Sequence, residues 1–189
     1  MVLYIKNMVC NRCKLMVKQE IERLQLHPTS VELGEVILEE KKLSQNQATE
    51  LEQRLQALGF ELIDDRKSRT IEKIKNAVID LVHYSDQQLN VNNSDYLSDK
   101  LHQDYSSLSK LFSEVEGMTI EQYIIRQKIE RVKELLVYDE LSLSEIADRM
   151  GYSSTAHLSA QFKKVTGLTP SFYKHMPAHN RKPLDEIGE

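Results

Sequence analysis

The chain has 189 residues, enough for two small domains, and its 25 Lys and Arg against 29 Asp and Glu give a net charge of −4. This balance excludes a broadly basic surface, so any contact with nucleic acid must come from a local face. No apolar run approaches the ~20 residues of a membrane span and the first residues lack a secretory pattern, so we expect a cytoplasmic protein with no membrane partner.

The first third of the chain alternates between strand and helix patterns. Alternating hydrophobicity predicts strands at 3–7, 30–33, 35–39 and 60–63, and apolar residues at helical spacing predict helices at 14–26 and 47–58. This βαββαβ order is that of the ferredoxin-like, split βαβ arrangement. We therefore expect an α+β chain whose first domain, residues 1–66, is ferredoxin-like.

Both cysteines of the chain lie in the segment Met8-Val-Cys-Asn-Arg-Cys13, where the first strand hands over to the first helix. Two thiols three residues apart can converge on one soft ion, and the helix N-terminus and Arg12 favour the thiolate form that metal binding requires. Cu(I) suits two soft ligands, whereas Zn(II) prefers four and only His27 lies nearby in sequence. The pattern predicts a soft-metal site at Cys10 and Cys13, with Cu(I) favoured, other soft ions left open, and no organic cofactor.

A Cys-x-x-Cys pair at a strand-to-helix turn is also typical of thioredoxin-like proteins. That family places a cis-proline against its cysteines, and this chain has no proline between Pro28 and Pro170. The element order, Met8 and the Leu58-Gly59-Phe60 sequence instead resemble the heavy-metal-associated domain of copper chaperones and metal-pumping ATPases. The chain departs from that family in having Asn7 where Gly is usual and bulkier residues between the cysteines. Cysteines that are only small buried side chains remain an alternative.

The polar run at residues 64–69 is the expected hinge between two domains. After it, apolar residues at helical spacing predict a helix from Thr70 to Tyr84, the first of an all-α domain at residues 70–177. Residues 178–189 are polar and are expected to form a disordered tail.

The most specific pattern of the chain lies at residues 141–170. Ser142 and Glu145 form a capping box, Gly151 offers a left-handed stop, and Ser153 or Ser154 can cap a second helix. We expect this second helix to turn Leu158, Phe162 and Val165 inward and to end at Gly167. Two short helices across a tight turn are typical of the helix-turn-helix, whose second helix enters a major groove.

The same unit occurs a second time, fifty positions earlier in the chain. Between the two copies, residues 119–137 carry apolar side chains at helical spacing behind a capping box of Thr119 and Gln122, which predicts one long connecting helix. Two units held by a stiff helix can face major-groove segments about 34 to 36 Å apart. The residues that repeat are Leu158, Ser159, Phe162, Val165, Gly167, Thr169 and Tyr173, which fall on Leu108, Ser109, Phe112, Val115, Gly117, Thr119 and Tyr123.

The pattern I-A-x-x-x-G-Y-x-S-x-x-x-L-x-x-x-F-K-K-x-x-G-x-T-P at Ile146–Pro170 resembles the signature of the AraC/XylS family of bacterial transcription regulators. The resemblance implies a DNA-binding domain of about seven helices with two helix-turn-helix motifs, double-stranded DNA as partner, and contact with RNA polymerase. It leaves open whether two chains associate. It also implies that outward positions of each second helix approach the DNA.

Candidate DNA-binding residues follow from this resemblance. Short hydroxyl and methyl side chains can contact thymine methyls, but neither helix offers an Arg for a bidentate guanine contact, so recognition is expected to lean on DNA shape. Lys110, Lys163 and Lys164 are candidates for phosphate contacts. The candidate base-facing positions are Ser106, Ser107 and Ser109 in the first copy, and Thr155, Ala156, His157, Ser159 and Ala160 in the second.

The sequence therefore predicts a DNA-binding transcription regulator that responds to a soft metal through Cys10 and Cys13. Two alternatives stay open: a regulator whose first domain serves only protein contacts, and an intracellular metal carrier with a helical docking domain. An enzyme is the least supported class, because no nucleophile stands in a recognisable cluster of His, Asp and Ser.

Overall fold

The computed structural model describes residues 1–63, 66–84, 92–176 and 181–187. The chain divides into two compact units, Met1–Asn76 and Ala77–Glu189. The division falls inside a helix, rather than at the polar run where the sequence places the hinge. Asp64 and Asp65 of that run lie outside the described residues, and Arg66 already begins the helix. No helix of the described residues is both long and apolar enough to cross a membrane.

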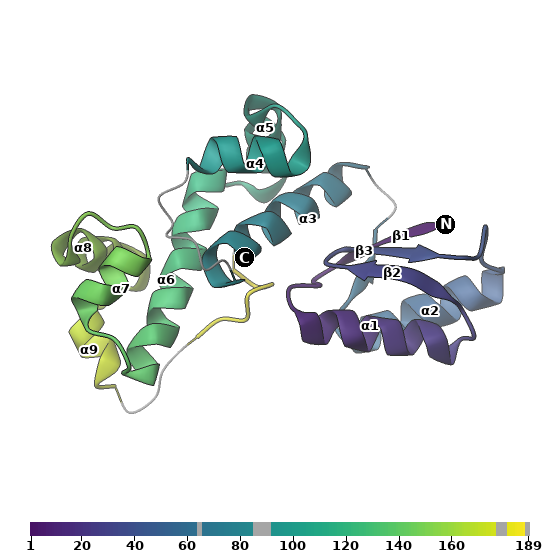
Figure 1. The fold of residues 1–189 in the computed structure, drawn as a ribbon, viewed down its shortest axis with the longest axis horizontal. Helices are drawn as coiled ribbons and strands as arrows, with labels where there is room; N and C mark the ends of the chain where they lie inside the picture. Colours follow the sequence, from purple (N-terminus) through teal and green to yellow (C-terminus); the bar gives the residue numbers. More distant parts are fainter. Residues whose placement is uncertain (64–65, 85–91, 177–180, 188–189) are drawn as a thin grey trace. The chain divides into compact units, whose positions relative to one another are not determined.

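The N-terminal unit is an antiparallel sheet with two helices on one face (Figure 1). Its strands lie in the order β2-β3-β1-β4, and all three neighbouring pairs are antiparallel. Strands and helices follow one another in the order that the sequence predicts. The elements are β1 (Val2–Lys6), α1 (Asn11–Arg23), β2 (Pro28–Glu32), β3 (Glu35–Leu38), α2 (Gln45–Ala57) and β4 (Glu61–Leu62).

The core of this unit lies between the sheet and the two helices. Alternate residues of the strands, such as Ile5 and Val36, point toward the helices, which contribute Val17, Ile21 and Leu51 among others. Each of these five side chains is fully buried, and burying one is worth roughly 1.5–3 kcal/mol. Packing of this kind fixes β1 against α1, and the two cysteines lie where these elements meet.

The helix α3 (Arg66–Ile79) joins the two units. Its first part contacts the N-terminal unit: the Arg69 guanidinium lies 4.5 Å from the ring centre of Tyr4, and Lys73 pairs with Glu35 at 3.3 Å. The sequence predicts one helix from Thr70 to Tyr84. The structure begins it earlier, at Arg66, and its last five residues form a separate π-helical segment, η1 (Asp80–Tyr84).

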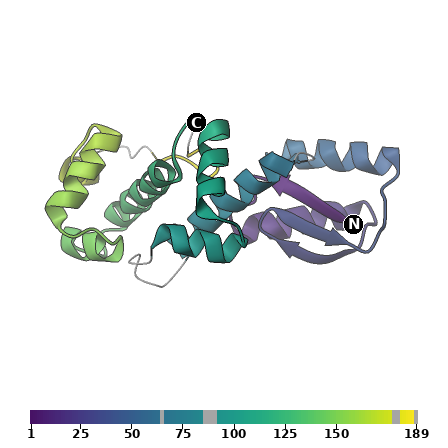
Figure 2. The same ribbon diagram turned by 90° about the horizontal axis from the view of Figure 1, so that it is seen from above.

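The remaining described elements are helical. The long helix α6 runs between the pair α4–α5 and the group α7–α9 (Figures 1 and 2). The predicted connecting helix at 119–137 is thereby confirmed. The elements are α4 (Asn93–Leu101), α5 (Tyr105–Glu116), α6 (Ile120–Tyr138), α7 (Leu143–Arg149), α8 (Thr155–Thr166) and α9 (Pro170–Lys174).

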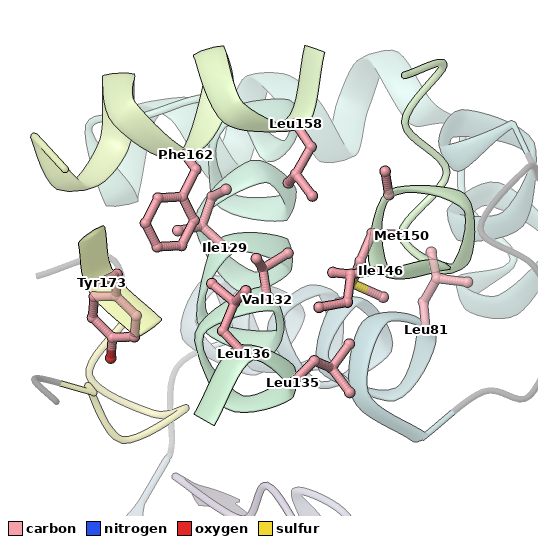
Figure 3. Packing of buried hydrophobic residues seen from close by; sticks show 11 residues of the cluster. Leu81, Ile129, Val132, Leu135, Leu136, Ile146, Met150, Leu158, Phe162 and Tyr173 are labelled. Carbon is pink, nitrogen blue, oxygen red and sulfur yellow. The ribbon is translucent and has the colours of Figure 1, made fainter. Parts of the chain in front are cut away.

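Apolar side chains from α6, α7, α8, α9 and η1 meet in one core (Figure 3). Phe162 of α8 lies edge-on to Tyr173 of α9, with ring centres 5.6 Å apart. The first copy repeats this pair as Phe112 and Tyr123, at 5.5 Å. The internal repeat seen in the sequence is therefore also a repeat of packing: both second helices contact a Tyr through their Phe, edge-on in the second copy and tilted in the first.

Two expectations about the C-terminal unit are wrong. Leu158 and Phe162 are fully buried as expected, but Val165 is 40% exposed and its counterpart Val115 is 48% exposed. Both valines lie in the last turn of their helices, where the inward face has passed the core.

The expected disordered tail is also incorrect for residues 181–187. Ile187 is buried, Leu184 O accepts a hydrogen bond from Gln127 Nε2 at 3.1 Å, and Lys182 N donates to Glu130 at 3.2 Å. Arg181 pairs with Glu134 at 3.5 Å. The apolar Ile187 and polar groups on α6 thus fix a segment whose composition alone suggests disorder.

Candidate nucleic-acid interface and cysteine pair

The second helix-turn-helix unit consists of α7, a tight turn and α8. Ser142 and Glu145 form the predicted capping box of α7, and Gly151 in the turn has a φ of +70°. Ser154, one of the two candidates, caps α8 by accepting a hydrogen bond from His157 N at 3.1 Å. The caps supply partners for backbone groups that the short helices leave open, so each helix begins and ends at a defined residue.

The long helix α6 also holds this turn. Lys128 Nζ donates to Met150 O at 3.0 Å and lies 5.7 Å from the ring centre of Tyr152. Burial lowers the pKa of Lys128 and raises the pKa of Tyr152 to about 12. Lys128 therefore acts as a positioning residue for the turn and is not available to a ligand.

The first unit consists of α4, a turn and α5. Asn92 caps α4, and His102 takes the left-handed conformation with a φ of +51°. The cap of α5 is Asp104, whose carboxylate accepts hydrogen bonds from Ser107 N at 3.1 Å and from the Ser106 hydroxyl. These hydrogen bonds lower the pKa of Asp104, so the cap is a charged group.

Most of the candidate DNA-binding residues face solvent, as a groove-reading surface requires. Ser109 and Ser159 are the two that are partly buried. His157 is exposed but held, because its Nδ1 lies 3.1 Å from Ser153 Oγ and its ring stands edge-on to Tyr152 at 5.2 Å. The exposed candidates are Ser106, Ser107, Lys110, Thr155, Ala156, His157, Ala160, Lys163 and Lys164.

Ion pairing separates the cations of the C-terminal unit into two classes. Within the described residues, Lys110, Lys163 and Lys164 have no carboxylate partner. Other cations of the unit are paired: Lys100 with Asp80, Arg131 with Glu134, Lys133 with Glu130, Lys174 with Asp139 and Arg181 with Glu134.

Two more cations were missed by sequence reasoning. Arg126 of α6 and Arg149 of α7 are exposed and have no ion-pair partner among the described residues. Arg126 lines a groove of about 970 Å³ together with Lys164 of α8 and Gly117 at the end of α5, so it lies between the two helix-turn-helix units. Arg126 is distinguished only by the ion pairs that other cations of α6 form in the folded structure. No motif in the sequence predicts those ion pairs.

The cysteine pair lies at the junction of β1 and α1. Asn7 has the left-handed conformation, with a φ of +70°, and Met8 is fully buried. Helix α1 begins at Asn11, earlier than the predicted Lys14, and Cys10 is its N-cap residue. Both thiols are half-buried, and their sulfur atoms lie 3.3 Å apart.

The two thiols differ in acidity. Burial alone would raise the pKa of Cys10, but hydrogen bonds from the Cys13 amide and thiol and from the Arg12 amide, with the Arg12 guanidinium, bring it below its ordinary value. Burial and the neighbouring Cys10 raise the pKa of Cys13. Cys10 is therefore the better thiolate of the pair.

The donor set fits a soft ion held by two sulfurs. Among the described residues no group of three or more His, Cys, Asp and Glu could hold a metal, and His27 is engaged by Glu40 at 2.9 Å. Cys10 and Cys13, whose sulfur atoms lie 3.3 Å apart, would hold the ion, and their thiolates would supply its soft ligands.

Comparison with known proteins supports the reading of the C-terminal unit. Residues 97–176 match a family model described as "Helix-turn-helix domain". The uncharacterized HTH-type transcriptional regulator YtdP of Bacillus subtilis is 26% identical over 160 residues, or 79% of this chain and 20% of that protein. The xylose operon regulatory protein of Escherichia coli is 38% identical over 69 residues, or 36% of this chain and 18% of that protein. The chain spans about a fifth of either relative.

A solved structure shares the fold of this part of the chain. The C-terminal domain of AraT, a response regulator from Geobacillus stearothermophilus, superposes with a TM-score of 0.50 at 24% identity. The match covers 62% of this chain and 95% of that one.

Proposed function

From the AraC-type helix-turn-helix domain in its C-terminal unit, we propose that this chain is a sequence-specific DNA-binding transcription regulator. One observation carries the proposal: α5 and α8 are two capped helices of equal construction, each held by a buried Phe and each exposing its first turn. Such a pair can enter successive major-groove segments of double-stranded DNA.

The charge distribution supports this proposal despite the net charge of −4. Four carboxylates of the C-terminal unit, Asp80, Glu130, Glu134 and Asp139, are paired with cations, whereas Lys163, Lys164 and Arg126 lack ion-pair partners among the described residues. Unpaired cations beside a reading helix are free to contact phosphates and fix its register.

The test is retention of genomic DNA fragments by the full chain, followed by sequencing and by titration of the enriched site. We expect enrichment of a common site. The variant Lys163→Ala/Lys164→Ala should weaken binding to that site, whereas Lys174→Ala, which removes a paired cation from the same unit, should bind as the parent does. Absence of any enriched site would refute the proposed function as a sequence-specific DNA-binding regulator.

A second component of the proposal is that the N-terminal unit is a heavy-metal-associated, ferredoxin-like domain that holds a soft metal ion through Cys10 and Cys13. It is supported by two thiols 3.3 Å apart with a thiolate-favouring environment at Cys10. Cu(I) is the favoured ion, because two sulfur ligands satisfy it and do not satisfy Zn(II). The ion would supply a soft Lewis-acid centre, and the chain would convert its presence into a change in DNA binding.

The metal proposal is tested by anaerobic titration with Cu(I), reading stoichiometry and DNA affinity separately. The reduced parent should bind one equivalent and change its DNA affinity. Cys10→Ser/Cys13→Ser should lose both responses and keep the apo affinity, and His27→Ala, a nearby residue held by Glu40, should keep both. An unchanged metal response in the double variant would refute this site.

The two alternatives are distinguished by the same data. Binding of DNA with no copper effect would favour an N-terminal unit that serves protein contacts. Binding of copper without any enriched DNA site would favour a metal carrier with a helical docking domain.

A further inference from the structure

The two reading helices are equal in construction, which makes their residues comparable position by position. Helices α5 and α8 have 12 residues each, and both end at a left-handed glycine, Gly117 with φ +67° and Gly167 with φ +77°. Each buries a Leu and a Phe at the same two positions. Residues fifty positions apart therefore occupy the same place on the two helices.

These equivalent positions carry different charges. Toward the end of α8 lie Lys163 and Lys164, and α5 has Ser113 and Glu114 at the same places. Thr166 of α8 corresponds to another carboxylate in α5, Glu116. Side chains at positions 114 and 164 are both exposed, so the difference is presented to solvent and to any ligand.

The N-cap residues of the two helices also differ in charge, and again the negative charge is on α5. The N-cap of α8 is the neutral Ser154, whereas the N-cap of α5 is Asp104, whose pKa is lowered by the Ser106 hydroxyl and the Ser107 amide. The helix dipole makes the N-terminus of a helix attractive to phosphate, and a capping carboxylate offsets that attraction. Asp104 also engages Ser106, a candidate base contact of the first unit.

We propose that the two helix-turn-helix units bind DNA unequally. Helix α8 provides most of the affinity, and α5 binds the adjacent groove segment weakly because Asp104 and Glu114 repel phosphate. The inference rests on the proposed DNA-binding function. Phosphate neutralisation sets most of the affinity and all of its salt dependence. Lys163 and Lys164 place that neutralisation on the second helix-turn-helix unit, whereas Arg126 lines a groove that reaches from α8 to Gly117 at the end of α5. Lys110 is the one cation among the α5 residues.

The test exchanges the charges at the equivalent positions of the two helices. Glu114→Lys should raise affinity for the enriched site roughly three- to tenfold and steepen the salt dependence by about one phosphate contact. Lys164→Glu should weaken binding at least tenfold. Lys110→Ala should weaken it far less than Lys164→Ala. Thermal unfolding of each variant verifies that the fold is retained.

Hydroxyl-radical footprinting locates the effects on the DNA. The parent should protect one groove segment strongly and the next weakly, and Lys164→Glu should lose the strong protection first. Glu114→Lys should deepen the weak protection. Equal protection of the two groove segments by the parent would refute unequal binding but not the proposed DNA-binding function. Equal losses of affinity on Lys110→Ala and Lys164→Ala would do the same. Failure of the parent to bind any site would instead refute the proposed function, and this inference with it.

Discussion

A half-buried imidazole, His83, packs against the long helix α6. His83 Nε2 contacts Gln127 Oε1 at 2.9 Å, and the fully buried Gln127 donates through Nε2 to Tyr123 and to Leu184 O. Burial lowers the pKa of His83 to about 4, against the opposing hydrogen bond to Gln127. The cations Arg131 and Arg181 lower it further, and Glu134 raises it.

This imidazole predicts acid sensitivity of the fold. Because the pKa of His83 is lower in the folded chain than in the unfolded one, the unfolded state takes up the proton first as pH falls below about 6.5. The free energy of unfolding should drop by roughly 2–3 kcal/mol between pH 7 and pH 4.5 from this group. Urea unfolding of the parent and of His83→Gln checks it, and parallel pH dependence in the two proteins would contradict it.

The cysteine pair predicts unequal thiol reactivity. Since the pKa of Cys10 is lowered and that of Cys13 is raised, a brief iodoacetamide pulse at neutral pH should label Cys10 first. Mass spectrometry of the labelled peptide, with Cys10→Ser and Cys13→Ser as references, measures the order. Faster labelling of Cys13 would show that the hydrogen bonds at Cys10 do not outweigh its burial.

At the scale of elements, the cap of α5 separates stability from DNA affinity. Asp104→Asn keeps a side-chain oxygen that caps the helix but removes the negative charge, so unfolding should change little while DNA affinity rises. Asp104→Ala should also raise affinity but lower the free energy of unfolding, because the cap is lost. Ser154→Ala, at the neutral cap of α8, should lose similar stability with no gain in binding. A drop in affinity on Asp104→Asn would contradict the electrostatic role of this cap.

Local signals made most elements predictable from the sequence. Capping boxes at Ser142 and Thr119 and glycines at 117 and 167 set the bounds of helices, because each satisfies backbone groups within a few residues. Helical periodicity predicts that Val165 faces inward, because the apolar spacing continues to the last turn of the helix. The core does not extend that far, so the side chain is exposed. Asp104 escaped notice because no Glu or Gln stands three residues later to complete a capping box.

The candidate interface was predictable in position but not in charge. The repeat located α5 and α8, yet only the ion pairs between distant residues, such as Lys174 with Asp139, identify the cations that remain unpaired. Arg126 has no ion-pair partner in the described part of the chain, although Arg131 and Lys133 of the same helix are paired. Such pairing depends on tertiary packing, which a single sequence does not encode in any local pattern.

For the whole molecule, we expect a shallow salt dependence of DNA binding, because few cations at the two helix-turn-helix units lack an ion-pair partner among the described residues. If Lys110, Arg126, Lys163 and Lys164 each neutralise one phosphate, the slope of log affinity against log salt is about −4. Anisotropy titrations of the full chain from low to moderate salt measure this slope. A much steeper slope would show that further cations reach the DNA and that the net charge of −4 conceals a wider basic face.

The docked segment at residues 181–187 bears on how the chain can be extended or shortened. Because Leu184 O satisfies the buried amide of Gln127 and Ile187 is itself buried, cutting the chain after residue 180 would open a polar hole beneath α6. A fluorescent protein or purification tag fused directly behind Glu189 would strain the contacts that Leu184 and Ile187 make. A flexible linker of several residues should leave the contacts of residues 181–187 with α6 in place, so such a fusion should stay folded.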